Sequence, residues 1–252
     1  TQLLQQLRHY QIPAIVNAKN AIKILEKEST IILDASAGKV YKKTSASSSK
    51  KAKLDLQLLS AINDSSEVNT SGGYHCDGVG LLRSEHFFIK TGKHPQQIIK
   101  SGPNEFIDKV VKDLTNLYHQ LYAINKTAPI ITYRSLNLDS NQLGKLQSGK
   151  TYEHLEVNPF LGFRGALRSI AKPSLLQLEL EILNKANSKL DNNINLMLPF
   201  VRTSFELKQV WDLVENNSKA HVYQPPVWLQ LTTPENLINF VDYLLSLIHI
   251  SE

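Results

Sequence analysis

The fold class of this 252-residue chain is decided by residues 77–88, which read DGVGLLRSEHFF. Their apolar run predicts a buried strand, yet the run ends on Arg83, whose guanidinium keeps its charge inside proteins. In a parallel α/β fold, the residues that follow a strand point into a crevice at the carboxyl edge of the sheet. The stretch therefore predicts a strand of a parallel sheet with an arginine in that crevice.

Short apolar runs alternate with helical patterns from residue 54 onward. The apolar runs are LDLQLLSA (54–61), DGVGLL (77–82), APIITYR (128–134), NINLMLPFV (193–201) and PPVWLQL (225–231). The helical patterns between them include residues 104–123, 174–187 and 204–216, and Ser204 is expected to cap the last of these helices. Strands and helices in this order predict parallel strands that are joined by helical crossovers.

The residues before this alternation predict a smaller α/β segment. We expect helices over residues 3–8 and 18–28 and a β-hairpin over residues 29–43. The residues that follow are rich in Ser and Lys and lack periodicity, which predicts a solvated linker. The predicted organisation is a small segment over 1–45, a linker over 46–53 and an α/β domain over 54–252.

Composition narrows the class of protein. A hydrophobic content of 42% and a charged content of 20% are ordinary for a globular protein, and no apolar run approaches the roughly 18 residues that a membrane span needs. The single cysteine, Cys76, excludes an internal disulfide, fits a reducing cytoplasm and is expected to be a small buried hydrophobe. The net charge of +5 is scattered, and the one dense basic run (47–53) lacks interleaved aromatic residues, so no nucleic-acid partner is expected.

Three arginines are the candidate binding residues. Arg83 and Arg134 each follow an apolar strand, and Arg164 lies in the glycine-containing run NPFLGFRG. Guanidinium groups that converge at one sheet edge hold a phosphate or a carboxylate by bidentate, charge-assisted hydrogen bonds. The alternative is that each arginine pairs with a nearby acid. The nearby acids are Glu85, Asp139 and Glu156.

Four ordered motifs resemble the PEP-utilising enzyme family, and its synthase branch in particular. They are DGVGLLRSEHFF (77–88), ITYRSLNLDSNQ (131–142), EVNPFLGFRGALR (156–168) and NLMLPFVRTSFELKQV (195–210). The resemblance implies that residues 54–252 form part of a (β/α)8 TIM-type barrel, with about six of the eight strands present. Residues 1–25 resemble the end of the swivelling phosphohistidine domain that precedes this barrel in the family. We therefore expect a fragment of a longer enzyme: an incomplete barrel preceded by a small α/β piece of a swivelling domain.

The resemblance implies a phosphotransferase of the phosphoenolpyruvate synthase type, which forms phosphoenolpyruvate (PEP) from pyruvate and ATP through a phosphohistidine. It assigns catalysis and substrate binding to Arg83, Arg134 and Arg164. Asn158, with Asn141, is expected either to bind substrate oxygens or to hold loops. Glu85 is expected to orient a neighbouring arginine. The alternatives are a PEP- or pyruvate-binding regulatory module without catalysis, and a pyruvate phosphate dikinase.

Two positions depart from the family pattern. The phosphorylated histidine position is Gln2, whose amide nitrogen is not nucleophilic, and His9 lies two helical turns away. The glutamate that binds Mg²⁺ in the family aligns with Thr232, a weak neutral ligand for a hard dication, and Glu235 lies beyond the following proline. The chain alone is therefore expected to be inactive, and no metal-binding residue is assigned.

The resemblance also implies partners. ATP would act on an ATP-grasp domain outside this chain, together with the rest of the swivelling domain, and Mg²⁺ would serve the reaction. Family members are commonly dimers through the barrel, which implies a homodimer. His94, in the synthase-like run KHPQQII, is expected in a surface loop.

Overall fold

The computed structural model describes residues 12, 14–16, 18–25, 31–35, 38–42, 56–63, 65, 67–68, 76–190, 193–219 and 225–244. The chain divides into two compact units. The first comprises Thr1–Leu56 and Asn69–Tyr74, and the second comprises Gln57–Val68 and His75–Glu252.

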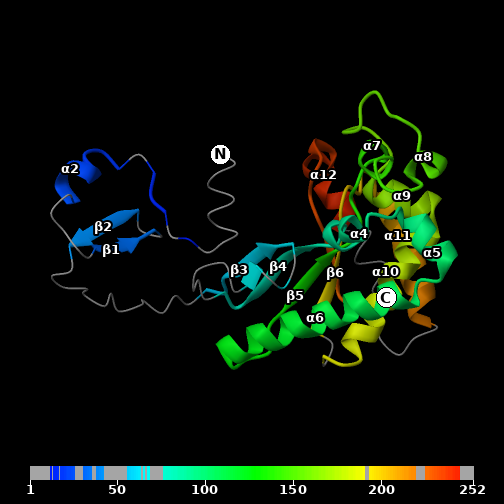
Figure 1. Ribbon diagram of the computed structural model, residues 1–252. Helices are drawn as coiled ribbons and strands as arrows, with labels where there is room; N and C mark the ends of the chain where they lie inside the picture. The colour runs from blue at the N-terminus through cyan, green and yellow to red at the C-terminus, as the bar shows by residue number, and fades with distance from the viewer. Residues whose placement is uncertain are drawn as a thin grey trace. The chain divides into compact units, whose positions relative to one another are not determined.

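The first unit contains a short helix and the expected hairpin (Figure 1). Helix α2 (Ala21–Leu25) precedes strands β1 (Ile31–Asp34) and β2 (Lys39–Lys42), which pair antiparallel. Gly38 takes a φ of 64° in the connecting turn, a conformation that glycine adopts without steric cost. The predicted helix over residues 3–8 and the predicted linker over residues 46–53 lie outside the described residues.

The second unit is built on a five-stranded parallel sheet in the order β3-β4-β5-β6-β7. The strands are β3 (Leu59–Ile62), β4 (Gly78–Arg83), β5 (Ile131–Arg134), β6 (Ile194–Leu198) and β7 (Val227–Leu229). Each strand matches one of the five apolar runs, with β3 and β4 extending one residue beyond the end of their runs. The parallel arrangement confirms the prediction of an α/β fold. The spatial order of the strands is the order along the chain.

Helices connect these strands (Figure 1). They are α4 (Glu85–Thr91), α5 (Pro95–Ser101), α6 (Asn104–Asn125), α7 (Ser140–Leu143), α8 (Gly149–Tyr152), α9 (Gly165–Ala171), α10 (Pro173–Asn187), α11 (Ser204–Lys219) and α12 (Pro234–Ile238). Helix α10 packs against α5, α6, α9, α11 and β6. Because crossovers between parallel strands are right-handed, strands added one after another in the same direction carry their helices on one face of the sheet.

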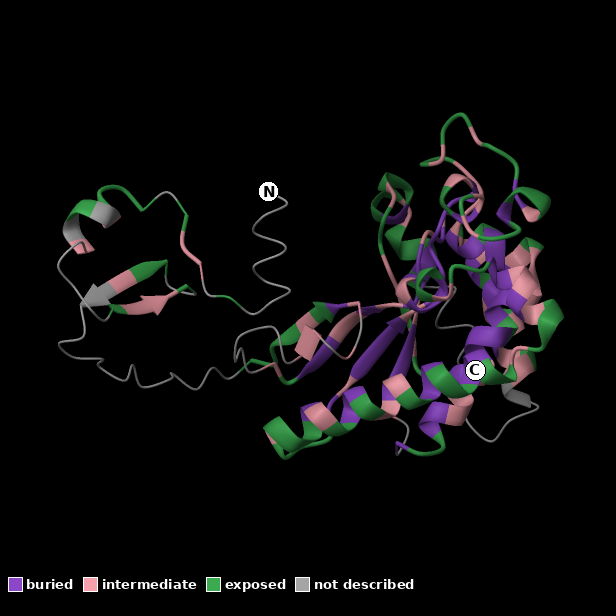
Figure 2. Cartoon of the chain, viewed as in Figure 1, coloured by how far each residue is buried: buried purple, intermediate pink, exposed green. Residues whose placement is uncertain are grey.

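The core lies between the strands and the inward faces of the helices, where Figure 2 shows the buried residues. In α6 the buried side chains recur every three or four residues, as expected for a helix with one apolar face. They are Phe106, Ile107, Val110, Val111, Leu114, Leu117, Tyr118 and Leu121. Cys76 packs against this core, as expected for a small hydrophobic residue, but it is only partly buried.

Two local expectations are wrong. The cap of α11 is not Ser204, which is the first helical residue; the hydroxyl of Thr203 accepts a hydrogen bond from the backbone N–H of Glu206 (3.1 Å). His94 is fully buried instead of lying in a surface loop. Its Nδ1 accepts from the backbone N–H of Gln96 (3.1 Å) and so caps α5. The run before Pro95 predicted a loop, but the pyrrolidine ring at the first helical position instead favours a helix start.

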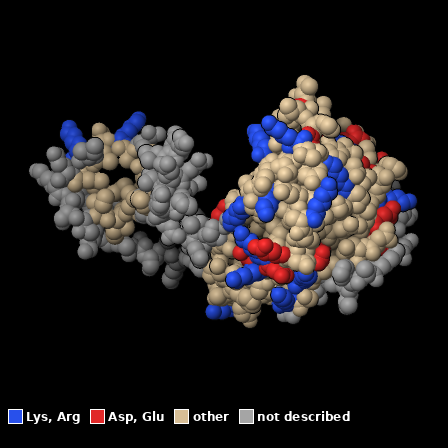
Figure 3. All heavy atoms as spheres, turned by 45° about the vertical axis from the view of Figure 1, so that its right-hand side comes forward, with Lys and Arg blue, Asp and Glu red and all other residues tan. Residues whose placement is uncertain are grey.

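On the face seen in Figure 3, Lys and Arg side chains are interspersed with Asp and Glu over the described residues. None of the helices in the described ranges is long and apolar enough to cross a membrane.

Candidate functional site

Two of the candidate arginines lie side by side at the carboxyl edge of the sheet. Arg83 is the last residue of β4 and Arg134 is the last residue of β5, and the two are paired in the register of these strands. Buried apolar residues such as Leu82 and Tyr133 precede them, so the strands are anchored up to the point where the charged side chains begin. The crevice predicted from residues 77–88 therefore exists at this edge.

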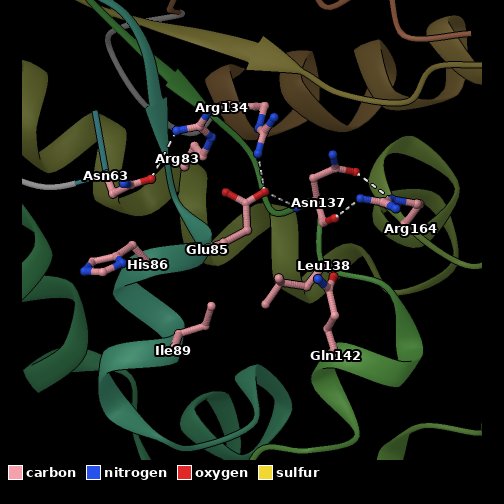
Figure 4. Close-up of a pocket in the computed structure, with 10 residues that line it drawn as sticks. All are labelled: Asn63, Arg83, Glu85, His86, Ile89, Arg134, Asn137, Leu138, Gln142 and Arg164. Atoms are coloured by element: carbon pink, nitrogen blue, oxygen red, sulfur yellow. Dashed lines mark hydrogen bonds and ion pairs between the residues drawn. The ribbon is translucent and has the colours of Figure 1, made fainter. Parts of the chain in front are cut away.

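A cavity of about 280 Å³ opens beside these strand ends (Figure 4). Its lining brings all three candidate arginines together, from segments that are far apart in the sequence. The lining residues are Asn63, Arg83, Glu85, His86, Ile89, Arg134, Asn137, Leu138, Gln142 and Arg164.

Arg134 is paired with the carboxylate of Glu85. Its Nη2 lies 2.7 Å from Glu85 Oε1, and both side chains are only about one-tenth exposed. Its Nη1 also reaches Gln230, the residue after β7, at 3.5 Å. Among the described residues, Arg134 Nε and Glu85 Oε2 are buried without a hydrogen-bond partner. This geometry agrees with the expectation that Glu85 orients an arginine.

Arg83 is held by a neutral side chain. Its Nη1 donates to Asn63 Oδ1 (3.2 Å), just after β3. The amide nitrogen of Asn63 in turn donates to Glu67 Oε1 (2.7 Å), which fixes the amide with its oxygen toward the arginine. An asparagine orients the guanidinium without neutralising it, so Arg83 keeps its full charge for a ligand.

Arg164 is held by Asn137, three residues after the end of β5. Its Nε and Nη2 donate to the side-chain and backbone oxygens of Asn137, at 3.1 and 2.8 Å. Its guanidinium lies 4.4 Å from the centroid of the Phe200 ring, in a cation–π contact. Burial lowers the pKa of Arg164, the charge of Asp139 acts in the opposite direction, and the neighbouring Arg134 lowers the pKa further. The guanidinium stays charged at neutral pH.

Pairing with nearby acids accounts for one arginine of the three. Arg134 pairs with Glu85. Asp139 and Glu156 form no ion pair with a cavity arginine in the described part of the chain, although the charge of Asp139 acts on Arg164. Asp139 caps α7 by accepting from the backbone N–H of Gln142 (2.8 Å). Glu156 accepts from the backbone N–H of Phe163 (2.6 Å). The acids therefore do not neutralise the arginines as a group.

The two asparagines left open by the sequence lie outside the cavity. Asn158 is exposed, and its Oδ1 accepts from the backbone N–H of Phe160 (3.2 Å) in a local turn. Asn141 makes two hydrogen bonds of 2.9 Å to the backbone of Glu156. Both contacts hold the loop that leads to Arg164, and substrate binding by Asn158 stays a prediction without a contact to the cavity.

Sequence reasoning missed the asparagines that hold the arginines. Asn137 lies three residues after Arg134 within the motif ITYRSLNLDSNQ, and this position could have identified it as a site residue. Asn63 lies in none of the four motifs. Only the pairing of β3 with β4 brings it beside Arg83.

A buried ion cluster, also missed, supports the loop behind Arg164. Arg168 donates to both carboxylate oxygens of Glu153 (2.6 and 2.9 Å) and to the carbonyl of Phe163 (2.8 Å). His94 Nε2 and Lys172 Nζ each lie 3.2 Å from Glu153 Oε1. Burial would raise the pKa of Glu153, but the hydrogen bonds from His94 and Arg168 dominate and hold it far below its usual range.

The residues expected at the magnesium position do not form a metal site. Thr232 is exposed, and its backbone N–H donates to Asn236 Oδ1 (3.0 Å). The carboxylate of Glu235 accepts from the side chain of Asn239. A hard dication needs several oxygen ligands, carboxylates among them. In the described ranges no group of three or more His, Cys, Asp or Glu is placed to hold a metal ion.

The cavity is suited to a small anion. Three guanidinium groups and one carboxylate are the formally charged groups among the described residues that line it, with His86 counted as neutral. A surplus of two positive charges, part of it withdrawn from water, attracts phosphate and carboxylate groups.

Comparison with known families finds one match. Residues 37–226 match the family described as PEP-utilising enzyme, PEP-binding domain. The matched span contains all three cavity arginines.

Curated relatives resemble the chain at low identity. A probable phosphoenolpyruvate synthase of Methanothermobacter thermautotrophicus is 27% identical over 252 residues, which covers 94% of this chain and 36% of the relative. A probable phosphoenolpyruvate synthase of Methanocaldococcus jannaschii is 26% identical over 250 residues, with 94% and 20% covered. A phosphoenolpyruvate synthase of Pyrococcus furiosus is 31% identical over 219 residues, with 80% and 26% covered. The chain thus spans only 20–36% of the length of these relatives.

Proposed function

Because the chain belongs to the PEP-utilising enzymes through their PEP-binding domain, we propose that its arginine cavity binds PEP and pyruvate. The single observation that carries this proposal is the convergence of Arg83, Arg134 and Arg164 on one cavity at the carboxyl edge of a parallel sheet. Pyruvate offers a carboxylate and PEP adds a phosphate, and both groups match guanidinium geometry.

The parent reaction we infer is that of a phosphoenolpyruvate synthase. In this reaction pyruvate, ATP and water give PEP, AMP and phosphate. One phosphoryl group passes from ATP through a histidine to the enolate oxygen of pyruvate, and a second is released to water as phosphate. The enolate oxyanion and the incoming phosphoryl group are both negative, so guanidinium groups that surround them lower the barrier electrostatically. In this scheme the cavity arginines are catalytic residues as well as binding residues. Pyruvate phosphate dikinase is the second enzymatic candidate.

The architecture we propose is a segment of a (β/α)8 barrel over residues 54–252, preceded by a linker over 46–53 and a swivelling-domain fragment over 1–45. The sequential strand order supports a barrel segment, because a doubly wound sheet reverses its order at a switch point. The ATP-grasp domain and the remaining swivelling domain would belong to a longer enzyme. The support for a longer enzyme is that the curated relatives are much longer than this chain. We further propose a cytoplasmic homodimer, on the family resemblance.

Magnesium has no step in this proposal. The resemblance implies Mg²⁺, but Thr232 and Glu235 do not fit a magnesium site. The electrostatic role is therefore assigned only to the arginines, and the chain alone is expected not to turn over.

The proposal is tested by titration calorimetry with oxalate, a planar dianion that resembles the pyruvate enolate. Arg83→Ala is the sharpest variant, because Arg83 pairs with the neutral Asn63 and its loss leaves no buried charge without a partner. Loss of a charge-assisted hydrogen bond is worth about 1.5–3 kcal/mol, so oxalate should bind roughly 10- to 100-fold more weakly. The matched control is Lys109→Ala, which removes an exposed positive charge from α6. Equal weakening in both variants would show non-specific charge attraction and contradict the proposal.

A binding module without catalysis is the alternative of a different class, favoured by Gln2 at the phosphohistidine position. Pyruvate-dependent formation of AMP from ATP separates the two. The full chain should bind oxalate without forming AMP, whereas the longer parent protein should form AMP if it is a synthase. A parent protein that binds oxalate but forms no AMP would favour the binding module.

A further inference from the structure

Glu179 lines no part of the cavity, yet its carboxyl group reaches the segment that organises it. The residue lies on α10 and is 1% exposed. Both carboxyl oxygens accept from the backbone N–H of Leu136, at 3.0 and 3.2 Å, and Oε1 also accepts from the hydroxyl of Tyr133 at 3.1 Å. A buried acid with this many partners on one short segment fixes that segment.

The next residue along the chain is held from another helix. The backbone N–H of Asn137 donates to Glu85 Oε1 (3.1 Å), on α4. Two consecutive N–H groups beyond β5 are thus bound by two buried carboxyl groups from different helices. Asn137 in turn accepts both hydrogen bonds that orient Arg164. Glu179 is therefore connected to Arg164 through two neighbouring residues: it binds the backbone of Leu136, and Asn137, the next residue, binds Arg164.

We propose that Glu179 is a positioning residue for the anion cavity: it fixes Leu136 and Asn137 so that Asn137 presents Arg164 to the ligand. The ligand in this inference rests on the proposed function, whereas the positioning itself is a property of the free protein. Glu179 acts through Asn137 and touches no ligand.

Ionisation of Glu179 predicts a second, electrostatic effect on the cavity, which is separate from its positioning contacts. Burial raises the pKa of Glu179 to about 8, although the N–H of Leu136 acts in the opposite direction, and the charge of Glu85 raises it further. The ionisable groups that face it are Tyr133 from β5 and Glu85 from α4. At pH 7 the carboxyl is therefore largely protonated. Above pH 8 it ionises and places a second buried negative charge behind a cavity that binds anions.

The experiment compares oxalate binding by the full chain at pH 7 and pH 9, where oxalate itself stays a dianion. Coupling between two sites is typically worth 5- to 150-fold, so the affinity of the wild type should fall roughly fivefold or more. Glu179→Gln keeps an acceptor oxygen but cannot ionise, so its affinity at pH 7 should match the wild type and stay constant to pH 9. Glu181→Gln, the same change two residues along α10, should behave as the wild type.

The same pH series in His86→Gln removes the ionisable imidazole of the cavity lining and should leave the decrease in place. A decrease that persists in Glu179→Gln would overturn this electrostatic effect.

Amide hydrogen exchange tests the positioning without any ligand. Glu179→Leu removes both acceptor oxygens, so the N–H groups of Leu136 and Asn137 should exchange at least roughly tenfold faster, with Val110 in α6 as the internal reference. Glu179→Gln should stay close to the wild type. If the wild type binds no oxalate, the proposed function is wrong. The exchange rates still test the positioning role of Glu179, because they are measured without a ligand. Unchanged exchange of both amides in Glu179→Leu would overturn it.

Discussion

Arg168 is a buried charged residue outside the cavity that supports the loop carrying Arg164. It pairs with Glu153 in a bridge whose side chains are 1% and 2% exposed. The same guanidinium holds the carbonyl of Phe163, next to Arg164. Its role is therefore to set the path of the loop that carries a cavity arginine.

We expect Arg168→Leu to destabilise the protein by about 3–5 kcal/mol, because it leaves the buried carboxylate of Glu153 without its main partner. The measurement is urea unfolding. The control is Lys185→Ala, which breaks an exposed pair with Glu181 and should cost no more than about 1 kcal/mol. Similar losses in the two variants would mean that the buried bridge is not structurally important.

Glu179 predicts a second effect, on stability against pH. Its pKa is raised from 4.5 to about 8 on folding, so the folded protein keeps a proton that the unfolded chain releases. The free energy of unfolding from this group is therefore highest below pH 4.5 and falls as the pH rises to 8. Glu179→Gln should remove this slope in urea unfolding between pH 5 and pH 8. A slope of wild-type size in the variant would contradict the prediction.

At the scale of the elements, a glycine allows the start of α9 to lie close to Pro199, the residue after β6. Gly165, at the start of α9, has a φ of 55°, and an added Cβ would lie 2.5 Å from the carbonyl oxygen of Pro199. Because this residue follows Arg164 directly, any displacement here moves a cavity arginine.

Gly165→Ala should lower the free energy of unfolding by more than about 2 kcal/mol. The left-handed conformation alone costs an alanine roughly 1–2 kcal/mol, and the close contact with Pro199 adds to this cost. Gly92→Ala is the matched control: its φ is 68°, but nothing lies within 4 Å of the added Cβ. Urea unfolding should therefore rank Gly165→Ala as clearly the more destabilised, with weaker oxalate binding as well. An equal loss in the free energy of unfolding for both variants would mean that the contact with Pro199 does not affect stability, which would contradict the prediction.

Elements were predictable where a local pattern decides them. The apolar runs located β3 to β7, and α6, α10 and α11 lie close to the helical patterns. The errors fall at helix starts, as for His94 and Ser204. A cap is chosen by the local backbone path, and several polar residues near a helix start can serve.

At the scale of the whole molecule, every residue that lines the cavity belongs to the second compact unit. A chain that begins at Gln57 should therefore bind oxalate within about twofold of the full chain, because no binding group is removed. Titration calorimetry with both chains measures this. Loss of binding in the shortened chain would mean that residues before Gln57 take part in the site.

The sequence by itself determined the alternation of strands and helices, the arginines at two strand ends and the family resemblance. These follow from periodicity and from short motifs, which are local along the chain. Only the tertiary structure decided which groups hold those arginines. Asn63 reaches Arg83 through strand pairing, Asn137 reaches Arg164 across a loop, and Glu179 reaches Leu136 from a helix more than forty residues away. Such partners are chosen by the need to satisfy buried polar groups in three dimensions, and no local pattern encodes that choice.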